Sequence, residues 1–359
     1  MRTIINRPDV AIIVLTRNAG ELWPAWIRGI KQQQVQAGRY LVLDSSSTDA
    51  TVSLALEAGL EVYSIDHRRF DHGGTRQLAA DLCPDADYLV YLTQDAILEQ
   101  PDSLERLLEP LTDEQVAMVY GRHVAHEFAS LIEKHARAYT YPARSTRRTV
   151  TDLEQLGFRA AFSSDVYAAY RVSALRSIGG FPSHVIVSED SYVSARLLLA
   201  GWTTVYNADS RVRHSHHYSL LHIFRRYFDV GVFHATEKAL LQRVGRPDRE
   251  AGAYVRSLIG FLNRHNRLLL PLAALQTLTK LLGFRLGQRH ARLPGRLCRM
   301  ISLQRAYWRY HKPASDEAHI WLAMGNKVRQ LQHQPVLPAM DRDSVQVVAG
   351  EKALSEITS

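Results

Sequence analysis

The sequence is poor in cysteine and contains no long apolar run. Its 359 residues include two cysteines, Cys83 and Cys298, which lie far apart and match no metal-binding or redox spacing. Such sparse use is typical of a reducing compartment, and we expect both to be packing residues. No stretch reaches the roughly 18 consecutive apolar residues of a membrane-spanning helix, and the N-terminus lacks the apolar core of a secretory leader. These absences predict a cytoplasmic protein.

Two glycine-rich phosphate-binding loops are also missing. No Gly-x-Gly-x-x-Gly follows the first expected strand, and no Walker lysine loop occurs in the chain. These absences argue against a dinucleotide-binding Rossmann enzyme and against a P-loop nucleoside triphosphatase.

Acidic residues are absent from one long C-terminal stretch. Residues 251–312 contain twelve Lys or Arg and no Asp or Glu, so the net charge of +8 divides into +12 here and −4 elsewhere. Leucine-rich segments alternate with these cations, which suits an anionic membrane surface. A helical cover for the rest of the protein fits equally well, with Pro271 dividing it into two helices. Nucleic-acid binding is a third interpretation, although no motif supports it.

Apolar runs alternate with helical spacing over the first 120 residues. The runs predict buried strands at 10–15, 40–43, 60–65, 88–92 and 116–120, and the stretches between them predict helices at 22–34, 51–58, 73–83 and 102–111. This alternation indicates an α/β fold with a mostly parallel, Rossmann-like sheet flanked by helices. Two more strands are expected at 166–170 and 204–206, and residues 220–310 are expected to be almost entirely helical.

The strand at 88–92 ends at Thr93, Gln94 and Asp95. A carboxylate at the C-terminal end of a buried strand lies where open α/β sheets bind their ligands. Asp95 is therefore a candidate ligand for Mg²⁺ or Mn²⁺, which proteins hold with few carboxylates together with substrate phosphates. The alternative is that Asp95 only caps a turn or a helix.

A polar loop from Asp44 to Asp49 follows the strand at 40–43. Its two carboxylates and four hydroxyls can accept hydrogen bonds from a nucleobase and a ribose. A plain capped turn uses the same residue types, so this alternative stays open.

An acidic pair, Glu189 and Asp190, opens a short helix further along the chain. An inverting transfer from an activated sugar needs a carboxylate base, and one of the pair is the candidate, while the other fits a helix start for electrostatic reasons alone. His214, in a histidine-rich turn, can supply an imidazole ligand to the metal. Arg225 and Arg226 can neutralise a departing diphosphate, although one of them fits a solvated helix face as well.

Taken in order, these motifs resemble the family-2 glycosyltransferases, which have the GT-A fold. The resemblance covers residues 10–228 and rests on Thr16-Arg17-Asn18, Asp44 to Asp49, Asp95, Gly179-Gly180-Phe181, Glu189-Asp190 and His214. It implies an inverting enzyme with a nucleotide-sugar donor and a Mg²⁺ or Mn²⁺ cofactor. Asp190 is then the catalytic base, with Glu189 as the alternative, and Asp95 and His214 hold the metal. Donor binding is assigned to Thr16, Asn18, Asp44, Ser46, Asp49, Arg76, Gln94, Arg225 and Arg226.

Further motifs narrow the resemblance to the bacterial rhamnosyltransferase branch, which builds O-antigen from dTDP-L-rhamnose. They run from Phe70 to Arg76, Thr93 to Ala96, Arg213 to Ser219 and Arg225 to Gly231. The implied acceptor is a saccharide or lipid-linked saccharide, no nucleic-acid partner is expected, and a UDP-hexose is the alternative donor. Thr93 stands where many relatives carry a first metal-binding Asp, and Gln77 where the branch usually has Asn.

This interpretation divides the chain into three regions. A GT-A catalytic domain covers residues 1–220, with a nucleotide-sugar half at about 8–120 and an acceptor half at about 121–220. A basic helical region covers 221–334, and residues 335–359 are expected to form a disordered tail. If the basic region docks on anionic lipid, the enzyme lies peripherally on the inner face of the plasma membrane.

Overall fold

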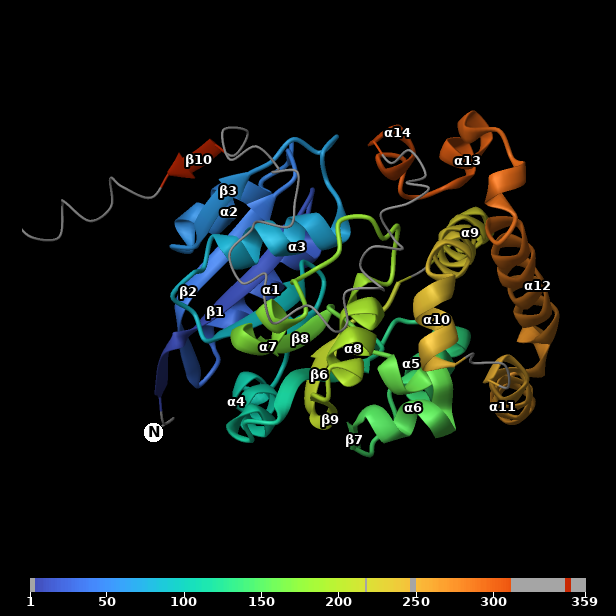
Figure 1. Cartoon of the computed structure of the whole chain (residues 1–359), viewed down its shortest axis with the longest axis horizontal. Coiled ribbons are helices and arrows are strands. Elements are labelled where there is room, and N and C mark those ends of the chain that lie inside the picture. Colours follow the sequence, from blue (N-terminus) through green and yellow to red (C-terminus); the bar gives the residue numbers. More distant parts are fainter. Residues whose placement is uncertain (1–3, 217, 246–249, 311–345, 350–359) are drawn as a thin grey trace, which may run out of the picture.

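The computed structural model describes residues 4–216, 218–245, 250–310 and 346–349 of the chain. Within these ranges every strand belongs to one ten-stranded mixed sheet. Helices cover both faces of the sheet, and a group of C-terminal helices lies on one side of the molecule (Figure 1). This is the α/β class that the alternation of strands and helices predicted.

The first half of the sheet is parallel. Its strands pair in the order β3-β2-β1-β4, and they are β1 (Ile5–Thr16), β2 (Val35–Asp44), β3 (Glu61–Ser64) and β4 (Tyr88–Thr93). The connecting helices are α1 (Trp23–Lys31), α2 (Thr51–Glu57) and α3 (His72–Asp81). Thr16 pairs with Asp44, and Leu15 with Thr93, so the carboxyl ends of three strands meet at one edge of the sheet.

The second half of the sheet is mixed. β8 (Tyr167–Arg171) runs antiparallel between β4 and β6 (Val116–Val124), β9 (Thr203–Arg213) lies parallel to β6, and β5 (Ile97–Leu98) and β7 (Thr146–Arg148) pair antiparallel with β9. The helices here are α4 (Ser103–Leu108), α5 (Leu131–Thr140), α6 (Val150–Leu156), α7 (Val172–Ser177) and α8 (Glu189–Leu199). β9 is much longer than the strand predicted at 204–206, and its extension brings His214 to the edge of the sheet.

The central strands are buried on both faces, so neighbouring residues enter different cores. Ile12 packs with Trp23 of α1 in one core, whereas Ile13 packs with Tyr91 and Phe181 in the other. Cys83 belongs to the second core, and Cys298 to a third core among the C-terminal helices. Both cysteines are buried and free, which confirms their packing role.

Residues 220–310 are almost entirely helical, as predicted. The helices are α9 (Leu220–Thr236), α10 (Lys238–Val244), α11 (Glu250–His265), α12 (Leu270–Gly287), α13 (Gly295–Ile301) and α14 (Tyr307–Tyr310). Pro271 lies in the first turn of α12, so the break between α11 and α12 falls where the proline predicted it. A third core, which contains Tyr192 of α8 and Phe228 of α9, joins these helices to the rest of the protein.

α12 packs along α9 at very short range because glycines line their contact (Figure 1). A Cβ placed on Gly287 would lie 2.0 Å from the carbonyl oxygen of Phe228, and one on Gly283 would lie 2.5 Å from that of Phe224. On the α9 side, a Cβ on Gly231 would lie 2.2 Å from the carbonyl oxygen of Phe284. The two backbones are therefore in contact, with no room for side chains between them.

Part of the expected disordered tail is a strand. β10 (Gln346–Ala349) pairs antiparallel with β3, which corrects the prediction for these four residues. β3 lies at the edge of the parallel half, where unpaired backbone groups can receive another strand. The other residues of 335–359, and residues 311–334 of the basic region, lie outside the described residues.

Candidate active site

Three loops at the carboxyl ends of β1, β2 and β4 are tied to one another. The Thr16 hydroxyl donates to the Asp44 carboxylate at 3.0 Å. The backbone N–H of Arg17 donates to Gln94 Oε1 at 2.7 Å, and Gln94 Nε2 donates back to the Arg17 carbonyl at 3.2 Å. The structure therefore brings together Thr16, Asp44 and Gln94, three of the residues assigned to donor binding.

Asp44 organises its own loop. Its carboxylate is buried and accepts from the backbone N–H of Ser47 at 2.8 Å as well as from Thr16. Asn18 has a positive φ of 46°, and its side-chain oxygen accepts from the backbone N–H of Thr48 at 2.8 Å. A non-glycine residue in this conformation is uncommon and is retained where the surroundings fix it. The loop is thus held in one shape before any ligand arrives.

Ser46 and Asp49 differ from Asp44 in their surroundings. Ser46 is exposed, has a φ of 59°, and donates its hydroxyl to the Ile65 carbonyl at 3.0 Å. Asp49 accepts from the backbone N–H groups of Gly20 at 3.2 Å and Thr51 at 3.0 Å, and the Thr51 hydroxyl bond is the main cause of its lowered pKa. These contacts at the start of α2 agree with a capped turn, so donor binding by Asp49 stays a prediction.

Asp95 lies beside two histidines rather than one. His214 Nε2 is 3.5 Å and His216 Nε2 is 3.3 Å from Asp95 Oδ2, and the three candidate ligand atoms lie within 4.8 Å of one another. The Thr93 hydroxyl donates to Asp95 Oδ1 at 2.6 Å, so Thr93 orients the carboxylate instead of adding a second one. This arrangement fits one divalent cation with a mixed oxygen and nitrogen ligand set.

The pKa shifts of Asp95 and His216 favour binding of a cation. Burial acts to raise the pKa of Asp95, but the hydrogen bond from His214 and the charges of both histidines lower it overall. Burial, and then the neighbouring His214, lower the pKa of His216 to about 4. At neutral pH Asp95 is therefore ionised and His216 is neutral, which are the protonation states that metal binding requires.

The Gly73-Gly74 segment at the start of α3 packs against the segment that runs from Gly179 to Pro182. Asp71 caps α3 by accepting from the backbone N–H groups of Gly73 and Gly74. A Cβ on Gly73 would lie 1.8 Å from the Pro182 carbonyl oxygen, so only glycine fits there. Gln77 Oε1 accepts from the backbone N–H of Phe181 at 2.8 Å, which gives Gln77 a structural contact between the two segments.

Arg76 lies in a buried ion-pair group. Its guanidinium is 2.8 Å from Glu189 Oε1 and 2.9 Å from Asp165 Oδ2, and its side chain is 7% exposed. Sequence reasoning assigned Arg76 to the donor and missed Asp165, which also accepts from the Tyr170 hydroxyl. The position of Asp165, immediately before the buried run of β8, was the available signal. Arg76 contacts acids here, and donor binding by Arg76 stays a prediction.

Glu189 and Asp190, the acidic pair at the start of α8, have different surroundings and therefore different pKa shifts. Burial acts to raise the pKa of Glu189, but Arg76 and then His72 lower it overall, so Glu189 is a stable anion. Asp190 is only partly buried, and among the described residues it forms no ion pair. Burial, followed by the negative charges of Glu189 and Asp165, raises the pKa of Asp190 to about 8. A pair whose pKa values are driven apart in this way is typical of groups with separate roles.

The backbone before this pair is unusual. Ser188, the residue that precedes α8, has a φ of 64° and lies in the left-handed region. Its side chain makes no capping hydrogen bond to the helix. Asp190 accepts from the backbone N–H of Ser191 at 2.6 Å and from that of Asp165 at 3.4 Å. The strain at Ser188 therefore accompanies the placement of both acids.

The two arginines of α9 are not equivalent. The charge of Arg226 contributes, after larger influences, to the pKa values of Glu189, His72 and His216, which places it near both halves of the site. Arg225 is half-buried, and its Nε lies buried without a hydrogen-bond partner among the residues that the structure describes. Of the two, Arg226 has the surroundings expected of a group that faces a diphosphate.

A C-terminal segment returns to the site. The buried Asp229 of α9 accepts from the backbone N–H of Leu303 at 2.9 Å. Next in the chain, Gln304 Nε2 lies 3.0 Å from His72 Nε2, and His72 Nδ1 is 3.9 Å from Glu189 Oε1. Residues 302–304 thus form a strap, anchored on α9, that touches the acidic half of the site.

Comparison with known proteins agrees with this geometry. Residues 11–179 match the sequence model of glycosyl transferase family 2. The O-antigen chain rhamnosyltransferase RfbN of Salmonella typhimurium is 39% identical over 83% of this chain and 96% of its own length. WbaN of Salmonella anatum, described in the same words, is 38% identical over 84% of this chain and 96% of its length.

A solved structure shares the fold. The mannosyltransferase PcManGT from Pyrobaculum calidifontis, in complex with GDP-Man and Mn²⁺, superposes with a TM-score of 0.50 at 20% identity, over 84% of this chain and 85% of that one. This likeness confirms the GT-A-type fold with a helical C-terminal part.

Proposed function

The chain belongs to glycosyltransferase family 2, and from this premise we propose that it moves L-rhamnose from dTDP-L-rhamnose to a saccharide or lipid-linked saccharide acceptor. The proposed setting is O-antigen-type surface polysaccharide synthesis. The observation that carries the proposal is 39% identity, over 83% of the chain, to an O-antigen chain rhamnosyltransferase. Family membership argues against the alternative in which the α/β part is only a scaffold for nucleic-acid binding.

The nucleotide binds where the carboxyl ends of β1, β2 and β4 meet. The loop from Asp44 to Asp49, held to Asn18 and Thr16 by hydrogen bonds, offers a preformed edge to the base and ribose. A loop that is ordered in advance loses little entropy when a ligand binds. Arg226 is the cation best placed to neutralise the diphosphate as it leaves.

Asp95, His214 and His216 would hold one divalent cation, and their chemistry favours Mn²⁺ over Mg²⁺. Mg²⁺ prefers an all-oxygen octahedral shell, whereas Mn²⁺ accepts imidazole more readily. When bound, the cation supplies positive charge against the donor diphosphate. His216 is an addition to the sequence-based assignment, which named Asp95 and His214.

Asp190 is the proposed general base of an inverting, single-displacement transfer. It would take the proton of the acceptor hydroxyl while the oxygen of that hydroxyl forms a bond to the anomeric carbon and the bond from that carbon to the diphosphate breaks. Glu189, which is paired with Arg76 and His72, is a weaker proton acceptor. Its negative charge helps to raise the pKa of Asp190, so the pair acts together even though only one member takes the proton.

The C-terminal helices would place the enzyme on an anionic membrane surface. Leu272, Leu275 and Leu282 of α12 recur at helical spacing and are 42%, 46% and 55% exposed. Exposed leucines among cations, without acids, match a helix that lies in a lipid interface. Among the described helices, none combines the length and apolar character needed to cross a membrane.

The donor is tested by calorimetric titration with dTDP-L-rhamnose and with a UDP-hexose, each in the presence of Mn²⁺. We expect dTDP-L-rhamnose to bind at least about tenfold more tightly, a difference that a few pocket contacts can supply. Tighter binding of the UDP-hexose would transfer the assignment to the alternative donor. Retention of the anomeric configuration in the product would exclude the inverting mechanism.

A further inference from the structure

The strap at residues 302–304 ends in a side chain that contacts the acidic half of the site. Its backbone is fixed at both ends: the N–H of Leu303 donates to the buried Asp229 at 2.9 Å, and the N–H of Gln304 donates to the Ser302 hydroxyl at 2.9 Å. The half-buried side chain of Gln304 therefore extends from a well-held backbone, and its Nε2 lies 3.0 Å from His72 Nε2.

The chemistry of this contact determines where His72 carries its hydrogen. A side-chain amide nitrogen can only donate, so the ring nitrogen that faces Gln304 Nε2 has to accept. A neutral imidazole has one donor and one acceptor nitrogen, so its hydrogen lies on Nδ1 when Nε2 accepts. His72 Nδ1 is 3.9 Å from Glu189 Oε1, so the hydrogen lies on the nitrogen that approaches this carboxylate.

The charged groups around His72 keep its imidazole neutral. Burial lowers the pKa of His72. The charge of Glu189 opposes this shift, whereas the charges of Arg76 and Arg226 add to it. A protonated His72 would cancel part of the Glu189 charge, which helps to raise the pKa of Asp190. A neutral His72 leaves that charge in place.

We propose that Gln304 is a positioning residue, which fixes His72 in its neutral Nδ1–H form beside Glu189. The inference rests on the proposed function, because Glu189 acts there through its charge on the base Asp190. In the Nε2–H form, by contrast, the lone pair of Nδ1 would approach the anionic Glu189 and repel it. The C-terminal region thus contributes to the acidic pair through one side-chain amide.

NMR of the full-length protein, labelled with nitrogen-15 in its histidines and free of donor and metal, tests the tautomer directly. At pH 7 the wild-type His72 should carry a hydrogen on Nδ1 and none on Nε2. Gln304→Glu has the same shape but offers a carboxylate that can only accept, so Nε2 should become protonated. The His72 signals, among those of sixteen histidines, are assigned by their absence in His72→Phe.

A wild-type His72 with its hydrogen on Nε2, or with a positive charge at pH 7, would overturn the proposal. An unchanged tautomer in Gln304→Glu would overturn it as well. Gln288→Glu, at the exposed C-terminal end of α12, is the matched control for net charge and should leave His72 in its wild-type form. Equal changes in Gln288→Glu and Gln304→Glu would reflect charge alone and would also contradict the proposal.

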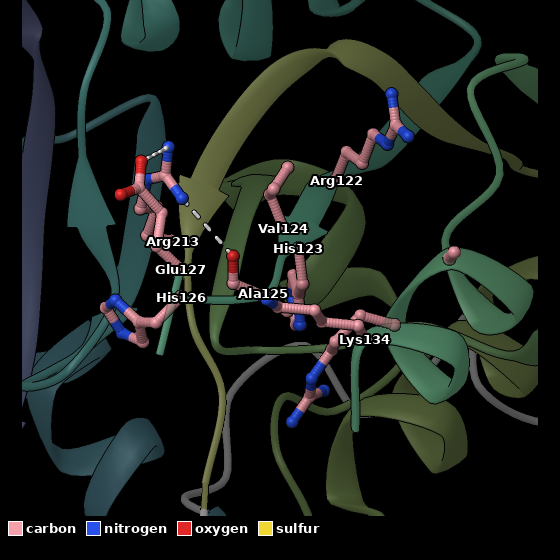
Figure 2. A pocket seen from close by; sticks show the side chains of 10 residues that line it. Arg122, His123, Val124, Ala125, His126, Glu127, Lys134 and Arg213 are labelled. Atoms are coloured by element: carbon pink, nitrogen blue, oxygen red, sulfur yellow. Dashed lines mark hydrogen bonds and ion pairs between the residues drawn. The ribbon is translucent and has the colours of Figure 1, made fainter. Parts of the chain in front are cut away.

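The same spectra contain internal references. Figure 2 shows a pocket of about 340 Å³ among the end of β6, the loop that follows it, α5 and the end of β9, and its lining includes His123 and His126. Within the part of the chain that the structure describes, no residue of the strap lines this pocket. The signals of these two histidines should therefore stay unchanged in Gln304→Glu, and a general change in all histidine signals would show that the variant disturbs the fold instead.

Kinetics separate this proposal from the proposed function. At saturating dTDP-L-rhamnose, Gln304→Glu should transfer rhamnose to the lipid-linked saccharides of a membrane extract roughly three- to tenfold more slowly, with an unchanged donor affinity by calorimetry. In a His72→Phe background the same substitution should have no further effect, because Gln304 acts through the imidazole. Equal slowing in both backgrounds would overturn the positioning role. If the wild-type protein transfers no rhamnose while the spectra are as expected, the proposed function is wrong and the tautomer assignment stands.

Discussion

At the scale of single residues, the carboxylates around the buried Arg76 differ in their electrostatic surroundings. Arg76 neutralises Glu189 and Asp165, and these two anions together make Asp190 hard to ionise. Because Asp190 has no cation of its own among the described residues, it gains most if it takes a proton. Glu189 and Asp165 therefore raise the proton affinity of Asp190, the proposed base, and each of these residues can be substituted separately.

Asp190→Asn should lower turnover by roughly 10²-fold or more, because an amide cannot accept the proton of the acceptor hydroxyl. Donor binding should persist, since the hydrogen bonds that Asp190 accepts come from Asp165 and Ser191 and not from the nucleotide loops. Turnover and donor affinity, measured on the same preparation, test both statements. Glu189→Gln is the contrasting variant: it removes half of a buried ion pair and should lower the free energy of unfolding by about 3 kcal/mol. Normal turnover in Asp190→Asn, with loss in Glu189→Gln, would make Glu189 the base.

The raised pKa of Asp190 predicts the pH dependence of the reaction. A general base works only when ionised, and the pKa of about 8 means that the ionised fraction grows as pH rises through that value. The plot of kcat/KM against pH should therefore rise between about pH 7 and 9. A plot that is flat over this range would show that another group takes the proton.

The same pKa has a consequence for stability. Because the folded-state pKa of Asp190 lies above its ordinary value of 3.8, the folded protein holds a proton that the unfolded chain releases, so stability falls as pH rises towards about 8. Asp190→Asn removes this loss of stability at high pH, because the amide does not ionise. Its melting temperature relative to the wild type should therefore be higher at pH 9 than at pH 5, and an equal difference at both pH values would contradict the assignment.

The metal group makes a prediction about His216. His216→Ala should weaken Mn²⁺ binding by about tenfold or more, because an imidazole close to Asp95 is lost. Calorimetric titration with Mn²⁺ alone measures this directly. His222→Ala is the control, since His222 stacks on Tyr218 and does not belong to the metal group. Equal affinities in the two variants would remove His216 from the ligand set.

Residue types and spacing predicted some of these positions and not others. Asp44 and Asp95 could be found because Asp44 directly follows a buried apolar run and Asp95 lies three residues after another, where the end of a strand is visible in the sequence. Asp165 could not be assigned a role because its partner, Arg76, lies on a helix 89 residues earlier in the chain. His216 required knowledge of the backbone conformation beyond β9, which decides which histidines face Asp95.

At the scale of elements, the close contact of α9 and α12 depends on glycine. Gly287→Ala should lower the free energy of unfolding by about 1–3 kcal/mol, because its Cβ would lie 2.0 Å from a backbone oxygen and the helices must separate. Gly260→Ala on α11 is the control, since its Cβ would meet no atom of the described residues within 4 Å and the substitution should be neutral or mildly stabilising. Denaturant unfolding of both variants tests this, and equal stabilities would show that α12 adjusts freely.

Strand segments that are buried on both faces could be predicted from the sequence, whereas the second half of β9 and the short strands β5, β7 and β10 could not. The predicted parts of β1 and β2, residues 10–15 and 40–43, are continuous apolar runs, as is most of β4, and β8 is nearly so, because these segments are largely buried on both faces. The second half of β9 contains Asn207, Asp209 and Arg211, so it resembles a loop in sequence although it is held by pairing with β6. β5, β7 and β10 contain four residues or fewer, which is too short for a pattern to emerge.

At the scale of the whole molecule, the three predicted regions are less separate than the sequence suggested. The third core combines residues of α6 and α8 with residues of α9, α10 and α13, so it crosses the boundary proposed at residue 220. In Figure 1 these helices lie on the side of the molecule away from β3, with α12 outermost. The division of the chain into domains stays a proposal about function.

The exposed face of α12 predicts how the protein meets a membrane. Leu275→Ser/Leu282→Ser should reduce binding to phosphatidylglycerol vesicles without lowering the melting temperature, because both side chains are about half exposed. Vesicle sedimentation at low and high salt measures the apolar and electrostatic parts. Val150→Ser, an exposed apolar position on α6, is the control. Equal binding by the double variant and this control would leave α12 as a cover for α9 only.

The strap at residues 302–304 limits how this protein can be recombined with its relatives. Gln304 touches His72 beside Glu189, and Asp229 on α9 holds the backbone of Leu303. A chimaera joined at residue 220 would therefore combine a strap and an acidic site from different parents, even though the junction lies outside both. The smallest exchangeable unit runs through residue 304, well beyond the family match at residues 11–179, so the acidic group around Glu189 and the C-terminal helices have to be exchanged together.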